Sequence, residues 1–313
     1  MRACVLGGGP SGIFVSEYLN NRGIAVELFE KSNTLLGNYK YARNKIDLLK
    51  NLNATVHLNS DENAIDDSKC DIYVIATGGK QKELDIEGSK YTLKAMDVIK
   101  NYYNDDAIND KRIKSLLNNN DSNVCIIGMG NVALDLAYYL KDKVSSITIL
   151  SRGDLSKATF DNHVMREIIN SNIFEINIIG NFEKAGDRKT QKRCEMLRNT
   201  DSKIRKLVAF LQRMFFGVSN PQLNLIFNTY PQSIKKNGDQ VEVCYSVNNE
   251  LKKSVFDAAI SSIGFIPNLP IIKTAKPMYY TGWCVNSKGN IGDAMVNART
   301  TVDNIIKANS VIV

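Results

Sequence analysis

Two glycine-rich turns are the features of this sequence whose residue types could do chemistry. Val124–Ala137 opens with a short apolar run, breaks at Gly128-Met129-Gly130 and continues with helical spacing. The first residues repeat this order, because Gly7-Gly8-Gly9-Pro10-Ser11-Gly12 follows Cys4-Val5-Leu6. Glycines at a strand-to-helix turn let backbone N–H groups approach a pyrophosphate, and the helix dipole favours its negative charge. One such motif is a weak signal, but a pair indicates two dinucleotide-binding units.

A carboxylate stands where a dinucleotide-binding unit needs one. Ile24–Phe29 predicts a second strand, and Glu30 follows that strand. An acid about 20 residues after the glycines accepts hydrogen bonds from ribose hydroxyls. The alternative is an exposed carboxylate at a strand end, but the spacing favours ribose binding.

The cysteines and histidines offer no further reaction centre. None of the 6 cysteines forms a C-x-x-C pair, which argues against a thioredoxin-reductase-like dithiol enzyme. Cys4, Cys125 and Cys244 lie in apolar or alternating strand runs, so we expect small buried side chains. His57 has no ligand-like neighbour, so a strand-edge role is favoured over metal binding. We predict no metal site.

Composition sets the broad class of the protein. A length of 313 residues with 43% hydrophobic content predicts about two domains with a sizeable core. No apolar run reaches the roughly 18 residues of a transmembrane helix. The net charge of +7 is spread along the chain, which indicates a basic surface or an acidic partner rather than nucleic acid. The first predicted strand begins at Arg2 or Ala3, so we expect no signal or transit peptide ahead of it.

The elements around the glycine turns predict an α/β fold. The predicted strands are 3–6, 24–29, 54–58, 71–76, 124–127, 146–150, 174–179, 223–227, 240–247 and 255–262. The predicted helices are 13–19, 44–51, 92–103 and 161–170, with a basic helical region over 184–213. The polar residues 104–123 predict a linker. The chain after Gly264 is too short and irregular to form a domain alone.

Six patches in order carry a resemblance to a known family. They are Cys4–Glu30; Ala76–Gly78 with Leu84–Gly88; Gly128–Asp135; Arg152-Gly153 with Phe160 and Arg166-Glu167; Ser261–Phe265; and Tyr280–Trp283 with Gly289–Ile291. Together they resemble the adrenodoxin reductase family, the mitochondrial-type ferredoxin–NADP⁺ reductases, of which this chain would be a short member. The resemblance implies two Rossmann-like dinucleotide-binding domains of the glutathione-reductase-like type. The FAD-binding domain would be 1–103 with 264–313, and the NAD(P)H-binding domain, 104–263, would be inserted in it.

The resemblance also implies which residues contact FAD. The residues matching family positions for the pyrophosphate and the adenosine are Gly7, Gly9, Pro10, Ser11, Gly12, Glu30 and Leu58. Those matching positions on the flavin side are Asn38, Gly78, Gly282, Trp283, Gly289, Asn290 and Ile291. Backbone amides of the last segment would stabilise negative charge on the reduced ring. The alternative for Trp283 is a plain core aromatic.

For the nicotinamide nucleotide the resemblance implies a second set. The matching residues are Met129, Gly130, Asn131, Val132, Ser151, Arg152 and Gly289. The family has two adjacent arginines on the 2′-phosphate. Ser151 replaces the first of them and could still donate a hydrogen bond to the phosphate. Val164 replaces an acid that the family has in the following helix. NADPH is therefore expected, with NADH as the alternative. Asp135 matches a carboxylate with a proposed proton-relay role, but the segment that carries its histidine partner is reduced here to Gly37–Lys45.

The basic residues of two predicted helices match contacts to an acidic partner. Arg166 matches an arginine that binds the ferredoxin, and Lys192 and Arg193 lie in the other basic contact; a solvated helix face is the equal alternative. The resemblance implies a FAD-dependent NADPH:ferredoxin oxidoreductase that reduces a two-iron two-sulfur ferredoxin for iron–sulfur cluster assembly. The expected location is a mitochondrion or mitochondrion-derived organelle, or else the cytoplasm. The alternatives are another NAD(P)H:acceptor flavoprotein of the superfamily and a non-catalytic flavin-bound scaffold.

Overall fold

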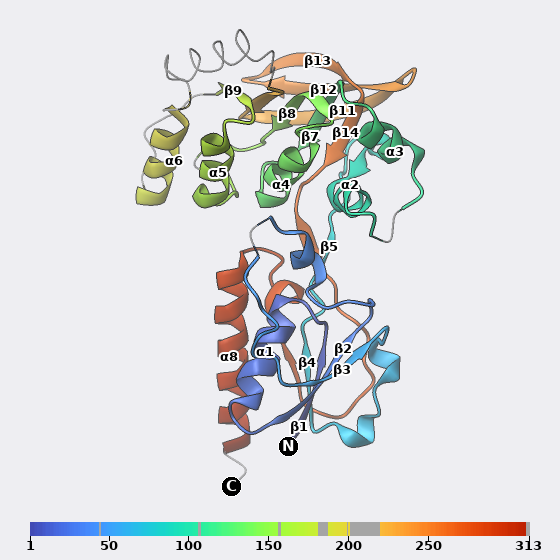
Figure 1. The fold of residues 1–313 in the computed structure, drawn as a ribbon, viewed down its shortest axis with the longest axis vertical. Helices are drawn as coiled ribbons and strands as arrows, with labels where there is room; N and C mark the ends of the chain where they lie inside the picture. Colours follow the sequence, from blue (N-terminus) through green and yellow to red (C-terminus); the bar gives the residue numbers. More distant parts are fainter. Residues whose placement is uncertain are drawn as a thin grey trace. The chain divides into compact units, whose positions relative to one another are not determined.

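The computed structural model describes residues 1–43, 45–105, 108–155, 158–180, 187–198, 200 and 220–310. The chain divides into two compact units (Figure 1). Unit 1 consists of residues 1–82 and 264–313, and unit 2 of residues 83–263. The second unit is therefore inserted into the first.

A five-stranded parallel sheet forms the centre of unit 1. In spatial order its strands are β16 (Met278–Tyr280), β4 (Ile72–Ile75), β1 (Arg2–Leu6), β2 (Ala25–Glu30) and β3 (Thr55–Leu58). The chain leaves β1 towards β2 on one side and later returns to β4 on the other. Open α/β sheets bind ligands at the carboxyl ends of strands where the order reverses in this way.

Two helices cover one face of this sheet and pack against each other (Figure 1). They are α1 (Pro10–Asn20) and α8 (Ile291–Ser310). The prediction of an irregular chain after Gly264 is wrong for the twenty residues of α8. Its buried stripe consists of Ala294, Ala298, Val302 and Ile305. Two of these are small, and the remaining residues are mostly polar, so the helical period is weak in the sequence.

Unit 2 is built on a six-stranded parallel sheet. In spatial order its strands are β6 (Leu93–Lys94), β14 (Ala258–Ser261), β7 (Ser122–Ile127), β8 (Val144–Leu150), β10 (Gln222–Ile226) and β9 (Glu175–Ile179). An antiparallel sheet of β11 (Thr229–Asn237), β12 (Gln240–Val247) and β13 (Glu250–Phe256) shares its apolar core. The helices α2 (Ala95–Tyr102), α4 (Asn131–Leu140), α5 (Asn162–Ser171) and α6 (Arg188–Arg198) pack in that order, each against the next (Figure 1).

The segment 83–123 differs most from its prediction. Residues 83–103 belong to unit 2 rather than to the first domain, because β6 pairs with β14 and α2 packs on α4. The predicted linker 104–123 contains α3 (Lys111–Asn118), which buries Ile113 and Leu116. Asp110 caps this helix by accepting a hydrogen bond from the Arg112 N–H. Only two apolar positions hold α3, too few to stand out in a polar stretch.

Three other predicted elements also change. The described part of the helix expected over 44–51 forms turns, because the Asp47 side chain accepts the Leu49 N–H and so competes with the helix. The strand expected over 255–262 is divided between β13 and β14. Of the basic region 184–213, α6 is described, and residues 184–186, 199 and 201–213 lie outside the described residues.

Short elements complete the description. They are the antiparallel pair β5 (Gly79–Gln81) and β15 (Phe265–Pro267), and the 3-10 turns η1 (Gly37–Tyr41), η2 (Glu62–Ala64), η3 (Asp67–Lys69), η4 (Ser89–Tyr91) and η7 (Gly282–Cys284). Within the described part of the chain, no helix combines the length and apolar character needed to span a membrane.

Candidate dinucleotide-binding sites

The first glycine turn joins β1 to α1 in a conformation that requires glycine. Gly7 has a φ of +102°, and a Cβ there would lie 2.4 Å from the Ala76 carbonyl oxygen. A Cβ at Gly12 would lie 1.9 Å from the Gly7 carbonyl oxygen. The helix starts at Pro10, and no side chain caps it. An uncapped helix N-terminus presents backbone donors and a positive dipole end, which suit a phosphate.

Glu30 lies beside this turn at the end of β2 and is buried. Its Oε2 accepts the Gly8 N–H at 2.8 Å, and its Oε1 accepts the backbone N–H and the hydroxyl of Ser32, each at 2.8 Å. A carboxylate has about four acceptor positions, so capacity remains for a ribose hydroxyl. Leu58 stands directly beside Glu30 in the sheet and is exposed. The predicted ribose and adenine contacts therefore lie together.

Two further segments of unit 1 approach the same turn. A Cβ at Gly37, the residue before the exposed Asn38, would lie 3.4 Å from the Gly9 Cα. A Cβ at Gly282 would lie 2.0 Å from the Ser11 hydroxyl oxygen. The C-terminal part of the unit is thus adjacent to the N-terminal turn, as a discontinuous FAD-binding domain requires.

The segment expected against the flavin has two notable contacts. Trp283 is half-buried, and its ring centroid lies 4.9 Å from that of Phe265. Asn290 caps α8, because its Oδ1 accepts the N–H groups of Gly292 and Asp293 at 2.9 and 3.2 Å.

The same cap uses a third amide, because the Asn290 N–H donates to Asp293 Oδ2 at 2.8 Å. A Cβ at Gly289 would also meet this carboxylate, at 2.6 Å. Of the segment expected to stabilise a reduced ring, the Asn290 N–H is therefore already bound by a side chain of the cap, and the role of the segment stays a prediction.

The second glycine turn repeats the geometry of the first in unit 2. Gly128 has a φ of +104°, and a Cβ there would lie 2.4 Å from the Ser262 carbonyl oxygen. Helix α4 begins after Gly130 with no side-chain cap. Met129 is buried, and Asn131 and Val132 are half-buried. Ala133, where the first turn has a third glycine, is fully buried.

The two residues expected at the 2′-phosphate have different environments. Ser151 is buried, and its hydroxyl donates to the Gly153 carbonyl oxygen at 3.1 Å. The Ser151 hydroxyl thus already has a backbone acceptor, and its donation to a phosphate stays a prediction. Arg152 is exposed. Asp135 is half-buried on α4, one turn after Asn131.

The three residues expected to bind a partner also differ in their exposure to solvent. Arg166 on α5 and Lys192 on α6 are exposed. Arg193 is only 3% exposed, so the prediction that it docks a partner is wrong. Burial lowers the pKa of its guanidinium, while the charges of Asp187 and Asp161 act in the opposite direction. Its polar atoms bind the chain itself, as detailed below.

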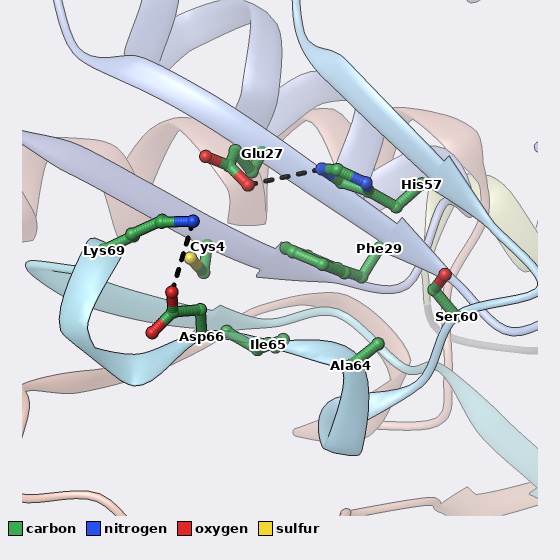
Figure 2. Close-up of a pocket in the computed structure, with 9 residues that line it drawn as sticks. All are labelled: Cys4, Glu27, Phe29, His57, Ser60, Ala64, Ile65, Asp66 and Lys69. Atoms are coloured by element: carbon green, nitrogen blue, oxygen red, sulfur yellow. Dashed lines mark hydrogen bonds and ion pairs between the residues drawn. The ribbon is translucent and has the colours of Figure 1, made fainter.

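A cavity of about 270 Å³ lies on the other face of the unit 1 sheet, opposite the helix-covered face (Figure 2). Its lining includes Cys4, Phe29 and Lys69, and none of the predicted cofactor-binding residues. His57 also lines it; its ring stacks on Phe29 at 4.5 Å and its Nε2 lies 3.2 Å from Glu27.

A disulfide at this cavity corrects one of the cysteine predictions. Cys4 is bonded to Cys70, whereas we expected an unpaired buried side chain. Cys125 and Cys244 are free and buried. The bonded cysteines are 66 residues apart, so no local spacing signals the pair.

Comparisons with known proteins agree with this geometry. Residues 40–177 match the family model described as pyridine nucleotide-disulphide oxidoreductase. No curated protein sequence matches the chain.

Solved structures match the chain over nearly its full length. FprA from Mycobacterium tuberculosis in complex with NADPH is 18% identical with a TM-score of 0.76, and the match covers 98% of this chain and 84% of FprA. Thioredoxin reductase from Lactococcus lactis is 15% identical with a TM-score of 0.55 and covers 98% of both chains. At these identities the likeness is one of fold. Residues 40–177 are therefore similar to the pyridine nucleotide-disulphide oxidoreductase family, in a chain with the fold of FprA.

Proposed function

We propose that this protein is an adrenodoxin-reductase-type flavoenzyme that takes electrons from NADPH through FAD to a two-iron two-sulfur ferredoxin. The observation that carries the proposal is the pair of uncapped glycine turns, one in each unit, with φ values of +102° and +104° at their first glycines. Two turns of one geometry suit two dinucleotides. FprA, whose fold this chain has, forms a complex with NADPH.

The residues of unit 1 fit FAD. The turn at Gly7–Gly12 would hold the pyrophosphate, Glu30 the ribose and Leu58 the adenine, while Trp283 would lie on the flavin side. When bound, FAD accepts a hydride and releases electrons singly, so the protein needs no nucleophile of its own. The chain's part is to bind and orient the two nucleotides.

The residues of unit 2 fit NADPH with a reduced phosphate clamp. Gly130, Asn131 and Val132 would hold the pyrophosphate through the N-terminus of α4. Arg152 would pair with the 2′-phosphate, since a guanidinium fork suits phosphate oxygens. Ser151 stands in place of the family's first arginine, and its hydroxyl binds the Gly153 carbonyl oxygen. Arg152 would therefore be the one arginine of this clamp.

The basic surface of α5 and α6 supports an acidic acceptor. Arg166 and Lys192 are exposed on two helices that pack together, in a chain of net charge +7. Opposite charges speed the encounter of two proteins and lose this effect in salt. By the resemblance alone, we propose that the ferredoxin serves iron–sulfur cluster assembly in a mitochondrion or mitochondrion-derived organelle. Fractionation of source cells would distinguish this location from the cytoplasm.

Anaerobic titration of the FAD-loaded protein with NADPH and with NADH tests the proposal. We expect the flavin absorbance to bleach with NADPH, and an added ferredoxin to be reduced in turn. Purification without flavin, even after expression with FAD supplied, would count against it.

A different acceptor is the second candidate. The burial of Arg193 removes one of the three basic residues expected at the ferredoxin contact, which favours another NAD(P)H:acceptor flavoprotein. Reduction of an artificial acceptor without any transfer to ferredoxins would support it. A flavin that neither nucleotide bleaches would instead indicate a non-catalytic scaffold.

A further inference from the structure

The loop between β8 and α5 is attached to the second glycine turn. The Asn131 side-chain amide donates to Asp161 Oδ2 at 2.8 Å, and the Asp161 backbone N–H donates back to Asn131 Oδ1 at 2.7 Å. The Thr159 hydroxyl donates to the Met129 carbonyl oxygen at 3.2 Å. A Cβ at Gly130 would lie 3.4 Å from this hydroxyl. The position of the loop therefore determines where the start of α4 and its backbone donors stand.

One arginine from another helix holds that loop. The Nη1 of Arg193 donates to the carbonyl oxygens of Leu155 and Ala158 at 3.0 and 2.8 Å, and its Nη2 to that of Phe160 at 3.0 Å. Its Nε donates to Asn162 Oδ1 at 3.0 Å.

The aromatic ring of the same loop adds a fifth contact, because the guanidinium carbon lies 4.6 Å from the Phe160 ring centroid. A buried guanidinium must have its donors satisfied, and here loop carbonyls outside any helix or strand satisfy three of them. The buried charge of Arg193 therefore needs the loop carbonyls as acceptors, and the loop needs Arg193 to hold those carbonyls in place.

We infer that Arg193 is a positioning residue for the nucleotide turn of unit 2. It acts through the loop between β8 and α5. Arg193 fixes the carbonyls at 155, 158 and 160, and this places Thr159 and Asp161. These two residues in turn hold Met129 and Asn131 of the glycine turn. The inference rests on the proposed function, because it assumes that the turn binds the pyrophosphate of NADPH. It gives Arg193 a role that differs from that of its exposed neighbour Lys192.

Two substitutions of Arg193 and one matched control test this role. Arg193→Met removes all the donors, and Arg193→Lys keeps the charge but not the planar fork. Arg188→Met, on the same helix, makes the same substitution at an exposed side chain. Each variant is studied as the full FAD-loaded chain, with NADP⁺ titration and with steady-state reduction of ferricyanide, so that no ferredoxin is involved.

We expect Arg193→Met to raise the Kd for NADP⁺ by roughly 10- to 100-fold, since a misplaced binding group costs rates and affinities of that order. The KM for NADPH should rise more than kcat falls, and the bound flavin should be unchanged. The values for Arg193→Lys should lie between those of the wild type and of Arg193→Met, and Arg188→Met should match the wild type. Wild-type values of Kd and KM in Arg193→Met would overturn the inference, as would equal falls in kcat and flavin content.

Hydrogen exchange gives a readout that does not depend on the nucleotide. In Arg193→Lys, amides of 128–135 and 158–162 should exchange faster, while those of the unit 1 strands stay the same. Faster exchange throughout unit 2 would mean a general structural role and would overturn the inference. If the wild type binds no NADP⁺, the proposed function fails, and the exchange data alone decide whether Arg193 positions the turn.

Discussion

At the scale of single residues, the different environments of Ser151 and Arg152 are the sharpest result. A resemblance to the adrenodoxin reductase family leads one to expect both Ser151 and Arg152 there. The structure buries Ser151 and commits its hydroxyl to the Gly153 carbonyl oxygen. We therefore propose that discrimination between NADPH and NADH depends on Arg152.

We predict that Arg152→Ala raises the KM for NADPH about 10- to 100-fold, because hydrogen bonds to charged groups contribute about 1.5–3 kcal/mol. The KM for NADH should change less than threefold, since NADH has no 2′-phosphate. Steady-state kinetics with ferricyanide as the acceptor measures both values. Arg166→Ala is the control, because it removes another exposed arginine of unit 2 and should leave both KM values unchanged. Equal losses for the two nucleotides would exclude the assigned role.

Glu30 is the second residue at this scale. It accepts the Gly8 N–H of the first turn and the Ser32 N–H just after β2, and we propose that it also accepts a ribose hydroxyl. We predict that Glu30→Gln raises the Kd for FAD at least tenfold and lowers unfolding stability by about 1–3 kcal/mol, because an amide nitrogen cannot accept the bonds of one carboxylate oxygen. Flavin release and thermal unfolding measure the two effects. Glu27→Gln, on the same strand but facing the cavity, should retain FAD (Figure 2).

At the scale of elements, the disulfide joins β1 to the residues just before β4. Cys4 and Cys70 enclose the first glycine turn, α1 and β2 in a covalent loop. A cross-link stabilises mainly by restricting the unfolded chain.

We predict that Cys70→Ser, or a phosphine reductant, lowers the unfolding free energy of unit 1 by about 2–4 kcal/mol. Thermal unfolding followed by flavin release measures this. Cys244→Ser, which removes a free cysteine of unit 2, should leave the sensitivity to the reductant intact. Identical unfolding of the wild type with and without reductant would refute the prediction.

The elements differ in how well the sequence predicts them. The strands β1, β4 and β7 are visible because continuous apolar runs are typical of central parallel strands. Helix α8 is not, because its buried stripe uses alanines among polar residues. Likewise β6 has only two residues and is a strand only because β14 lies beside it.

At the scale of the whole molecule, charge governs the proposed encounter with an acidic ferredoxin. We predict that raising ionic strength from about 0.05 to about 0.5 M lowers kcat/KM for the ferredoxin roughly tenfold, because the Debye length falls well below the range of the attraction. Reduction of a neutral quinone should change little. The double variant Arg166→Glu with Lys192→Glu should show a weaker salt dependence of ferredoxin reduction. If the rate of quinone reduction fell with salt as much as that of ferredoxin reduction, docking through charge would be contradicted.

The sequence by itself determined the two glycine turns and the acid after the second strand, whereas the insertion of one unit into the other was expected from the family resemblance. The turns follow from local requirements, because a φ near +100° and a close carbonyl demand glycine wherever the turn occurs. Only the tertiary structure decided that Arg193 faces inward, that Ser151 binds backbone and that Cys4 meets Cys70. Whether a polar side chain on a helix or strand binds a partner or the protein itself depends on which face is packed, and residues distant in sequence supply that packing.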